Sequence, residues 1–561
     1  MRRIVSAVCL ALVATTALHA ADELFRNGRT DYTIVVDADA PDEVRACAEE
    51  LQEYVRLLSG AEMPITTQMT GKDVRLRVTT QQGEGYHYYK EGSRLVIEGG
   101  GKRGLLYGIY AFLEQEMGVR WLTPDETWLP RLKKYRLRDL DVAAQPAFDY
   151  RMIYTYDALH SDEWCAHNGV NQQDGCVKNR LGGMEAWWGM HTFHQLVPTE
   201  TYYDKHPEFF GLWEGKRIDD GQLCLTNARM LDTLVTALER KMAEEPDYWV
   251  YDVSQNDNLK YCQCDACTAL AEQYGGQSGL MIWFVNQVAA RIGKTHPEKY
   301  VGTFAYRYTR EVPRDIRPAP NVAVRLCSFE CCFAHNLDDC QRNTQFVQDL
   351  KGWHALTQNL YVYDYCVGFK QYIAPLPYFR PLQNRLQRFR QEGVKGVLEL
   401  GAYDTPWSDF SELKNWVMAK LLWNPSADVD SLAQIFIEKY YGKAAKPVQK
   451  FYLLTQQLPQ PETHFTIYCD YKNSAFTADY MTRAMQLADD AVAAAGKDTV
   501  LLQRVNRVVA QALFLQVMHH PVTAPADGTL ERLRTILSDD PTYLMEHRQT
   551  LDDLLRHWTY I

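Results

Sequence analysis

The sequence predicts an α/β protein in three parts: an N-terminal α/β sandwich domain, a central (β/α)8 barrel of the TIM type, and a C-terminal helical domain. Three observations predict this class. Residues 22–145 mix strand and amphipathic-helix patterns, and residues 146–425 alternate short apolar strands with helices. Residues 426–561 carry helical periodicity alone. We therefore expect domain boundaries near residues 145 and 425.

The first 21 residues have the pattern of a secretory signal peptide. Arg2 and Arg3 precede an unbroken apolar stretch that ends in small residues at Ala20 and Ala21. We expect this segment to be removed and the protein to be exported, to the periplasm or to the medium. No other segment approaches ~18 consecutive apolar residues, so we expect no membrane insertion of the mature chain.

The N-terminal domain is expected to hold three strands and two amphipathic helices that cover them. Expected strands are "YTIVVDADA" (32–40), "DVRLRVTTQ" (73–81) and "SRLVIEGG" (93–100), and expected helices are "PDEVRACAEELQEYVRLLSG" (41–60) and "RGLLYGIYAFLEQEMG" (103–118). No catalytic cluster is evident in this part.

The central part offers eight strand candidates, which is the number that closes a (β/α)8 barrel. They are "FDYRMI" (148–153), "MHTFHQLV" (190–197), "GQLCLTN" (221–227), "YWVYDVS" (248–254), "YVGTFAY" (300–306), "VAVRLCSF" (322–329), "LYVYDY" (360–365) and "VKGVLEL" (394–400). In such barrels the active site lies at the C-terminal ends of the strands. Functional residues are therefore expected there.

Polar and aromatic side chains do gather at these strand ends. Candidates for catalysis are Asn256, Asp257, Glu330 and Glu399; candidates for substrate binding are Arg151, His191, His194, Tyr306, Tyr363, Asp364 and Trp407. A carboxylate at a strand end can instead cap the next helix or pair with an arginine, and an aromatic residue can belong to the core. Both interpretations stay open for each residue.

Several chemistries are disfavoured. The chain carries a net charge of −11 without a basic run, which argues against nucleic acid as a partner. No G-x-S-x-G, H-E-x-x-H, P-loop or dinucleotide motif is present. His191 and His194, three apart on an expected strand, would point to opposite faces, which argues against a shared metal. We expect no metal in catalysis and no cofactor.

Carboxylates with tyrosines and an asparagine suit glycoside hydrolysis, so a glycan is the expected partner. One option is substrate assistance, in which Asn256 holds a 2-acetamido group and Asp257 donates a proton; Glu330 or Glu399 could equally be the acid. A second option is an exo-acting glycosidase with Glu330 and Glu399 as acid and base and Arg151 pairing with a sugar carboxylate. A third is a glycan-binding protein without catalysis.

Several motifs carry a family resemblance. "GLLYGIYAFLEQEMGVRWLTPDETWLP" resembles the α/β domain that precedes the barrel in family 20 hexosaminidases and family 67 α-glucuronidases. "VSQNDNLKYCQCDAC", "RLCSFECCFAH", "YVYDYCVGFKQYIAPLPYF" and "AKLLWNPSADVDSLAQIFIEKYYG" resemble the domain of unknown function 4838 family, which includes glycoside hydrolase family 163. That resemblance implies a retaining, substrate-assisted endo-β-N-acetylglucosaminidase that cuts the GlcNAc–GlcNAc core of complex N-glycans. Asn256-Asp257 stands where family 20 has Asp-Glu.

The cysteines allow three interpretations. The chain has 14, and removal of Cys9 with the signal peptide leaves an odd number in an exported protein. Cys262, Cys264 and Cys267 form a C-x-C-x-x-C motif that could join disulfides, bind zinc with a fourth ligand, or stay as thiols. The fourth partner was sought past the sixth strand, among Cys327, Cys331, Cys332 and Cys340. In each case the motif would hold the loop that carries Asn256 and Asp257.

Overall fold

The computed structural model describes residues 22–80, 83–172, 181, 183, 186–538 and 542–556. The expected signal peptide, residues 1–21, lies outside them. The chain forms two compact units: Met1–Val119 with Leu129–Ala144, and Arg120–Trp128 with Gln145–Ile561.

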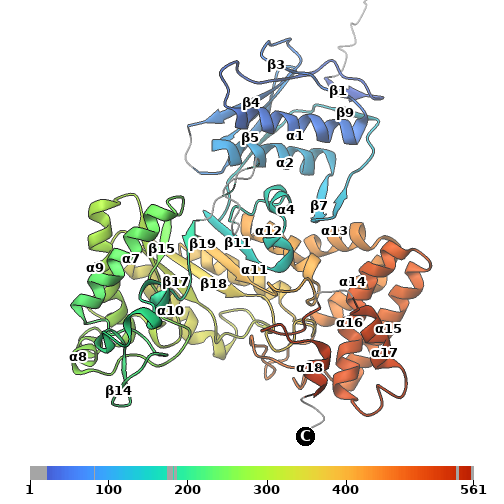
Figure 1. Ribbon diagram of the computed structural model, residues 1–561. Helices are drawn as coiled ribbons and strands as arrows, with labels where there is room; N and C mark the ends of the chain where they lie inside the picture. Colours follow the sequence, from blue (N-terminus) through green and yellow to red (C-terminus); the bar gives the residue numbers. More distant parts are fainter. Residues whose placement is uncertain are drawn as a thin grey trace, which may run out of the picture. The chain divides into compact units, whose positions relative to one another are not determined.

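The first unit is a six-stranded sheet with two helices (Figure 1). Its strand order is β10 (Asp141–Ala144), β5 (Tyr86–Glu91), β6 (Arg94–Gly100), β4 (Asp73–Thr79), β2 (Thr33–Val35) and β3 (Ile65–Thr66). Helices α1 (Asp42–Ser59) and α2 (Gly101–Met117) pack on the sheet and on each other. Gly99 and Gly104 allow α2 to lie close to β6, because a Cβ on Gly99 would fall 2.1 Å from the Gly104 carbonyl carbon. A short pair, β1 (Glu23–Arg26) and β9 (Lys134–Arg136), completes the unit.

The second unit is built on a curled sheet of seven strands in which every neighbouring pair is parallel (Figure 1). The order is β11 (Tyr150–Tyr154), β19 (Gly396–Leu400), β18 (Leu360–Tyr365), β17 (Val322–Cys327), β16 (Tyr300–Ala305), β15 (Val250–Asp252) and β12 (Trp187–Trp188). The connecting helices are α7 (Ala228–Glu244), α8 (Asp265–Gln273), α9 (Gln277–Thr295), α10 (Thr344–Leu356), α11 (Phe379–Gln391) and α12 (Ser411–Trp423).

Six of the eight expected barrel strands overlap strands of this sheet, and two do not. Residues 190–197 contain the short helix α5 (Phe193–Leu196), because the backbone of His191 is left-handed (φ 54°) and cannot continue a strand. Residues 221–227 form a loop. The strand β12, which consists of Trp187 and Trp188, was missed since two residues give no periodicity.

One residue links the two edge strands of the curled sheet. The backbone N–H of Gln172 donates to the carbonyl of Arg151 on β11 (3.2 Å), and its side-chain Oε1 accepts from the N–H of Ala186, next to β12 (2.9 Å). Gln172 therefore bridges the two edges through its backbone and its side chain.

The interior of the sheet is filled by aromatic rings around one buried arginine. The guanidinium of Arg325 on β17 lies 3.7 Å from the ring centroid of Trp187 and within 6 Å of those of Tyr150, Phe304 and Tyr363. Because side chains alternate along a strand, residues two apart from these also face inward, and the residues between them face the helices. This alternation decides which strand-end residues can reach a ligand.

The helices after residue 426 belong to the same compact unit as this sheet. They are α13 (Val429–Tyr441), α14 (Ala445–Thr455), α15 (Ala478–Ala495), α16 (Thr499–His519), α17 (Thr529–Ile536) and α18 (Leu551–Arg556). Side-chain caps start three of them: Asp428 accepts from the N–H of Ser431, Thr477 from that of Tyr480, and Asp498 from that of Leu501. Within the described residues, none of the helices is both long and apolar enough to cross a membrane.

Two irregular segments run from these helices back to the loops of the sheet. The carbonyl of Phe465 accepts from the N–H of Phe333, and that of Ile467 accepts from Phe369 (both 2.7 Å). Farther along the chain, the N–H of Glu546 donates to the carbonyl of Phe369 (2.9 Å). Segments 456–477 and 542–550 therefore contribute side chains to the C-terminal edge of the sheet.

The remaining elements are short connections in the second unit. They are β7 (Arg120–Thr123), β8 (Glu126–Trp128), α3 (Tyr156–Leu159), α4 (Asp162–His167), α6 (Thr199–Tyr202), β13 (Leu212–Trp213) and β14 (Lys216–Arg217), with 3-10 turns at Pro207–Phe209, Arg307–Thr309, Gln341–Asn343 and Gly442–Ala444.

Candidate active site

A cluster of carboxylates, aromatic rings and one arginine lies at the C-terminal edge of the parallel sheet. Parallel strands bring their C-terminal ends to one edge, so residues that follow different strands meet there. The members are Asp257 after β15, Tyr306 and Arg307 after β16, Phe329 after β17, Tyr365 at the end of β18, Asp404 after β19, and Tyr468 and Glu546 from the two irregular segments. We call this set the mouth cluster.

Asp257 is the exposed carboxylate of the cluster, with 56% of its side chain accessible. Its Oδ1 accepts a hydrogen bond from the Tyr306 hydroxyl (3.1 Å) and lies 3.6 Å from Nη1 of Arg307. One cation and one hydroxyl donor therefore lie beside this carboxylate. Arg307 has a left-handed backbone (φ 51°), which is costly for a non-glycine residue and is typical of functional sites.

Aromatic rings form one wall of the cluster. The ring of Phe329 lies 5.3 Å from Tyr306, 6.0 Å from Tyr365 and 5.7 Å from Tyr468, each nearly edge to face. The guanidinium of Arg307 lies 4.6 Å from the centroid of Phe329. Tyr468 remains 44% exposed. An exposed ring beside charged groups is suited to stacking on the C–H face of a sugar.

Glu546 and Asp404 are partly buried carboxyls with raised pKa values. Burial raises the pKa of Glu546, and the negative charges of Asp257 and Asp404 raise it further, against a lowering effect of His547. Burial is also the main cause of the raised pKa of Asp404. The charges of Asp257 and Asp404 both act on Glu546, and the backbone N–H of Glu546 donates to the carbonyl of Phe369 at the C-terminal edge of the sheet (2.9 Å). Their environments differ, because Asp257 has a cation and a hydroxyl donor beside it, while Glu546 is half-buried, with Nε2 of His547 3.9 Å from its Oε2.

The side-chain amide of Asn256 forms hydrogen bonds within the protein rather than pointing freely into the mouth cluster. Its Nδ2 donates to the carbonyl of Gly221 (2.9 Å), and its Oδ1 accepts from the N–H of His194 (3.3 Å). The amide thus links the loop after β15 to two neighbouring loops. These contacts favour a structural role over the expected role in holding an acetamide group.

The two histidines occupy different environments. Nδ1 of His191 donates to the carbonyl of Gln255 (2.6 Å), and its ring lies 5.9 Å from that of Tyr306 at the mouth cluster. This hydrogen bond leaves Nε2 as the acceptor of a neutral ring. His194 lies on α5, where burial lowers its pKa.

Three other predicted residues point to the outer face of the sheet. Asp364 forms a fully buried ion pair with Arg385 of α11, with Nε to Oδ2 at 2.7 Å. Glu399 is fully buried and accepts from the Tyr378 hydroxyl (2.6 Å), and burial followed by the charge of Asp364 raises its pKa well above the usual range. Arg151 donates to the carbonyls of Gly169 (2.7 Å) and Phe148 (2.6 Å).

The last three predicted residues lie near the cluster or away from it. Glu330 is 46% exposed and pairs with Arg310. The pKa of Tyr365 is raised mainly by burial, and the charge of Glu330 is one of the smaller causes. Tyr363 is packed inside the sheet near Arg325. Trp407 lines a separate cavity of about 470 Å³, where Arg507 lies 4.9 Å above its ring.

The sequence reading missed Asp404, Tyr468 and Glu546. Asp404 had a detectable signal, since it follows the last expected strand at a barrel end. Tyr468 and Glu546 had none, because only the fold brings segments 456–477 and 542–550 to the sheet.

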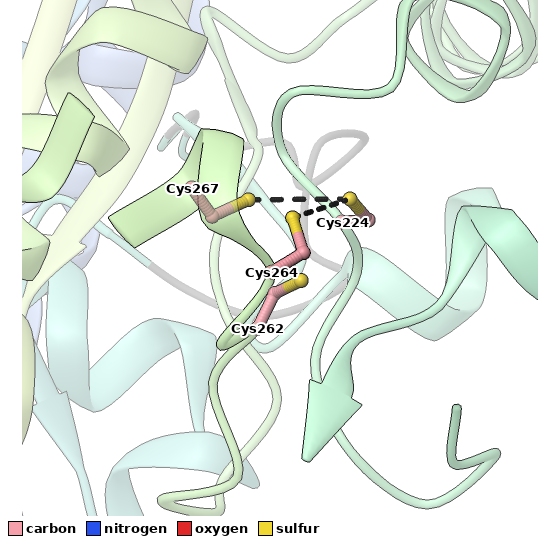
Figure 2. Close-up of side chains that lie close together, drawn as sticks. All are labelled: Cys224, Cys262, Cys264 and Cys267. Carbon is pink, nitrogen blue, oxygen red and sulfur yellow. Dashed lines mark hydrogen bonds between the residues drawn. The ribbon is translucent and has the colours of Figure 1, made fainter. Parts of the chain in front are cut away.

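Two groups of side chains in the described residues have the spacing of metal ligands. Figure 2 shows the first, Cys224, Cys262, Cys264 and Cys267, with their sulfur atoms turned toward one another. Sγ of Cys224 lies 3.7 Å from Sγ of Cys264 and 3.9 Å from that of Cys267. A disulfide needs about 2.05 Å, so the structure holds these residues as thiols.

The partner of the C-x-C-x-x-C motif is Cys224, and not one of the four cysteines sought past the sixth strand. Two of those four, Cys332 and Cys340, belong to the second group, with His335 and His464. Cys224 lies in the loop before α7, 38 residues before Cys262 in the chain, and only the fold brings it to the motif.

A parallel, curled sheet of seven strands with connecting helices forms a half-barrel, which is consistent with the TIM-like fold of glycoside hydrolases. The chain matches the family described as Domain of unknown function (DUF4838) over residues 121–453, and it belongs to that family. A comparison with curated protein sequences found no match.

Solved structures of glycoside hydrolases share the fold at low sequence identity. One is a family GH115 4-O-methyl-α-glucuronidase with specificity for decorated arabinogalactans; the TM-score is 0.63 at 11% identity, covering 94% of this chain and 77% of that one. Another is a family 89 glycoside hydrolase from Clostridium perfringens, in complex with 2-acetamido-1,2-dideoxynojirmycin (TM-score 0.53, 10% identity, 89% of this chain). This chain spans 65% of the length of the family 89 chain.

Proposed function

We propose that the protein is a glycoside hydrolase that works at the mouth cluster. The observation that carries this proposal is the contrast between two carboxyls. Burial raises the pKa of Glu546 despite the lowering effect of His547, and the charges of Asp257 and Asp404 add to the rise, whereas Asp257 contacts Arg307 and Tyr306. Glycosidases need such a pair, one carboxylic acid to protonate the departing oxygen and one anion to stabilise the developing positive charge.

In this mechanism Glu546 is the proton donor to the glycosidic oxygen. Asp257 keeps its negative charge beside the anomeric centre, and Tyr468 and Phe329 offer apolar surface to the sugar ring. The strained backbone of Arg307 fixes the guanidinium that orients Asp257. Asp404 raises the pKa of Glu546 and so helps to keep it protonated.

The finer proposal is a retaining, substrate-assisted endo-β-N-acetylglucosaminidase that acts on the core of complex N-glycans. Its support is the resemblance carried by the barrel motifs, together with the Asp257–Tyr306 pair. A carboxylate can accept the acetamide N–H while a tyrosine hydroxyl donates to the acetamide oxygen. Asp257 then takes the orienting role first considered for Asn256, and Glu546 that of the acid. The export expected from residues 1–21 would bring the enzyme to glycoproteins outside the cytoplasm.

An exo-acting hydrolase that uses two protein carboxylates is the alternative. Asp404 favours it, because it gives the mouth cluster a third carboxyl that can act as nucleophile or base. The carboxyls first considered for this role fit less well, since Glu399 is fully buried against Tyr378. Arg151 likewise uses its guanidinium on backbone carbonyls rather than on a substrate.

The test is glycan release measured by mass spectrometry. The full chain is incubated with complex-type N-glycoproteins and with a panel of aryl glycosides, including β-GlcNAc and α-glucuronide. Released glycans that end in one GlcNAc, and inhibition by GlcNAc-thiazoline, support the finer proposal. Turnover of an aryl glycoside that resists the thiazoline supports the alternative.

A pair of variants ties the activity to the mouth cluster. Glu546→Gln should abolish turnover, whereas Glu531→Gln, on the exposed face of α17, should retain it. Saturable glycan binding without turnover of any substrate would overturn the hydrolase proposal in favour of a glycan-binding protein. Full activity in Glu546→Gln would overturn the assignment of the acid.

A further inference from the structure

We propose that Cys224, Cys262, Cys264 and Cys267 bind a structural zinc ion. A tetrahedral zinc with Zn–S bonds of ~2.3 Å places its sulfur ligands about 3.8 Å apart. Sγ of Cys224 lies 3.7 and 3.9 Å from two of the other sulfur atoms, and all four sulfur atoms lie within 4.8 Å of one another. Four cysteines are one of the closed ligand sets of structural zinc, and they leave no open position for chemistry.

The surroundings of the sulfur atoms suit thiolates. The backbone N–H of Leu212 donates to Sγ of Cys262 (3.3 Å), and Nη1 of Arg217 lies 3.8 Å from the same atom. Donors of this kind stabilise negative charge on metal-bound sulfur and orient the ligands. Cys224, Cys262 and Cys267 are at most 4% exposed, so water has little access to the bonds.

The ion would join two loops that the sequence separates. Cys224 precedes α7, and the other three cysteines lie between β15 and the first turn of α8. The loop after β15 carries Asp257, so zinc at this site would fix the backbone that presents the carboxylate to the mouth cluster.

A second zinc site follows from a different set of residues, Cys332, His335, Cys340 and His464. Sγ of Cys332 lies 3.3 Å from Nδ1 of His335, and Sγ of Cys340 lies 3.6 Å from Nδ1 of His464. Zn–N bonds of ~2.1 Å and Zn–S bonds of ~2.3 Å place such ligands about 3.6 Å apart. Two thiols and two imidazoles are an established structural set.

A hydrogen bond orients one imidazole toward this second site. Nε2 of His335 donates to the carbonyl of Gln460 (3.2 Å), which leaves the Nδ1 lone pair directed at the sulfur of Cys332. Zinc-bound histidines donate their other ring N–H in the same way. The ion would tie the loop after β17, which carries Phe329, to the segment that carries Tyr468.

Metal analysis of the full chain tests both sites. The protein is purified without chelators, and zinc per chain is measured by inductively coupled plasma mass spectrometry. We expect two zinc ions per chain, one after Cys267→Ser and one after His464→Ala. Cys165→Ser, which changes a buried cysteine outside both groups, should retain two.

X-ray absorption at the zinc edge keeps the test decisive if a variant fails to fold. The unaltered protein should show an average of three sulfur and one nitrogen ligands per zinc. A single zinc with sulfur ligands only would support the first site and overturn the second, and a single zinc with mixed ligands would do the reverse. Zinc-free protein, disulfides among Cys224, Cys262, Cys264 and Cys267 found by peptide mapping, or stoichiometric iron would overturn the zinc assignment.

Discussion

The carboxylates of the inner and outer sides of the same sheet have opposite environments. On the outer side, Asp364 and Glu399 face the helix layer, are fully buried, and have protein partners in Arg385 and Tyr378. At the mouth, Asp257 is exposed, and Glu546 is partly exposed, with its pKa raised by burial and by Asp257 and Asp404 against the lowering effect of His547. The end of a strand fixes the edge at which a residue lies, but the alternation along the strand decides whether it meets a ligand or a helix.

The largest expected effect separates Glu546 from Glu399. Glu546→Gln removes the proposed acid and should lower kcat/KM by ~10²–10⁴-fold, the usual contribution of general acid catalysis. Glu399→Gln keeps the hydrogen bond with Tyr378 possible and should change kcat/KM little. Steady-state kinetics on a shared substrate would measure both. Equal losses would show that the two sides do not differ as described.

The buried ion pair on the outer side should dominate stability. Asp364→Asn leaves the buried Arg385 without its anion and should cost ~3–5 kcal/mol of unfolding free energy. Asp430→Asn on α13 breaks the exposed pair with Arg380, which lies on α11 like Arg385, and should cost under ~1 kcal/mol. Urea denaturation monitored by circular dichroism would give both values. A small loss for Asp364→Asn would contradict its structural role.

Neighbouring residues 256 and 257 sharpen the comparison at one loop. Asp257→Asn should lower kcat by ~10²-fold or more, because it removes the charge beside the anomeric centre. Asn256→Ala should act on folding, with a loss of ~1–2 kcal/mol for two hydrogen bonds, and only modestly on kcat. Thermal unfolding and kinetics on both variants would separate these outcomes. The reverse pattern would return the orienting role to Asn256.

The smallest expected effect is a shift in pH dependence. The charge of Asp404 raises the pKa of Glu546, so Asp404→Asn should lower that pKa. Glu546 would then lose its proton at lower pH, and the alkaline limb of the kcat/KM profile should move toward lower pH. Asp204→Asn, an exposed change elsewhere, should leave the limb in place. A shift to higher pH would contradict Glu546 as the acid.

The sequence predicted the fold further than it predicted the site. Six barrel strands were found because apolar runs bounded by polar residues are a strong local signal. The sequence does not predict which face of the sheet the side chains of Asp364 and Glu399 occupy, because a shift of one residue in a strand moves every side chain to the other face. The sequence predicts Asp257 and Tyr306 at the C-terminal edge of the sheet because both follow a strand, and both lie at that edge. Glu546 and Cys224 depend on contacts between distant segments, for which no local pattern exists.

The remote origin of Glu546 has a consequence for biosynthesis. All seven strands of the sheet, the last ending at Leu400, leave the ribosome well before the segment that carries Glu546. A nascent chain can therefore assemble its barrel and acquire Asp257, Arg307 and Asp404 while still lacking the proposed proton donor. On that proposal the newborn polypeptide is held inert during translation, and a cut between α17 and residue 546 would return a mature molecule to the same silent condition.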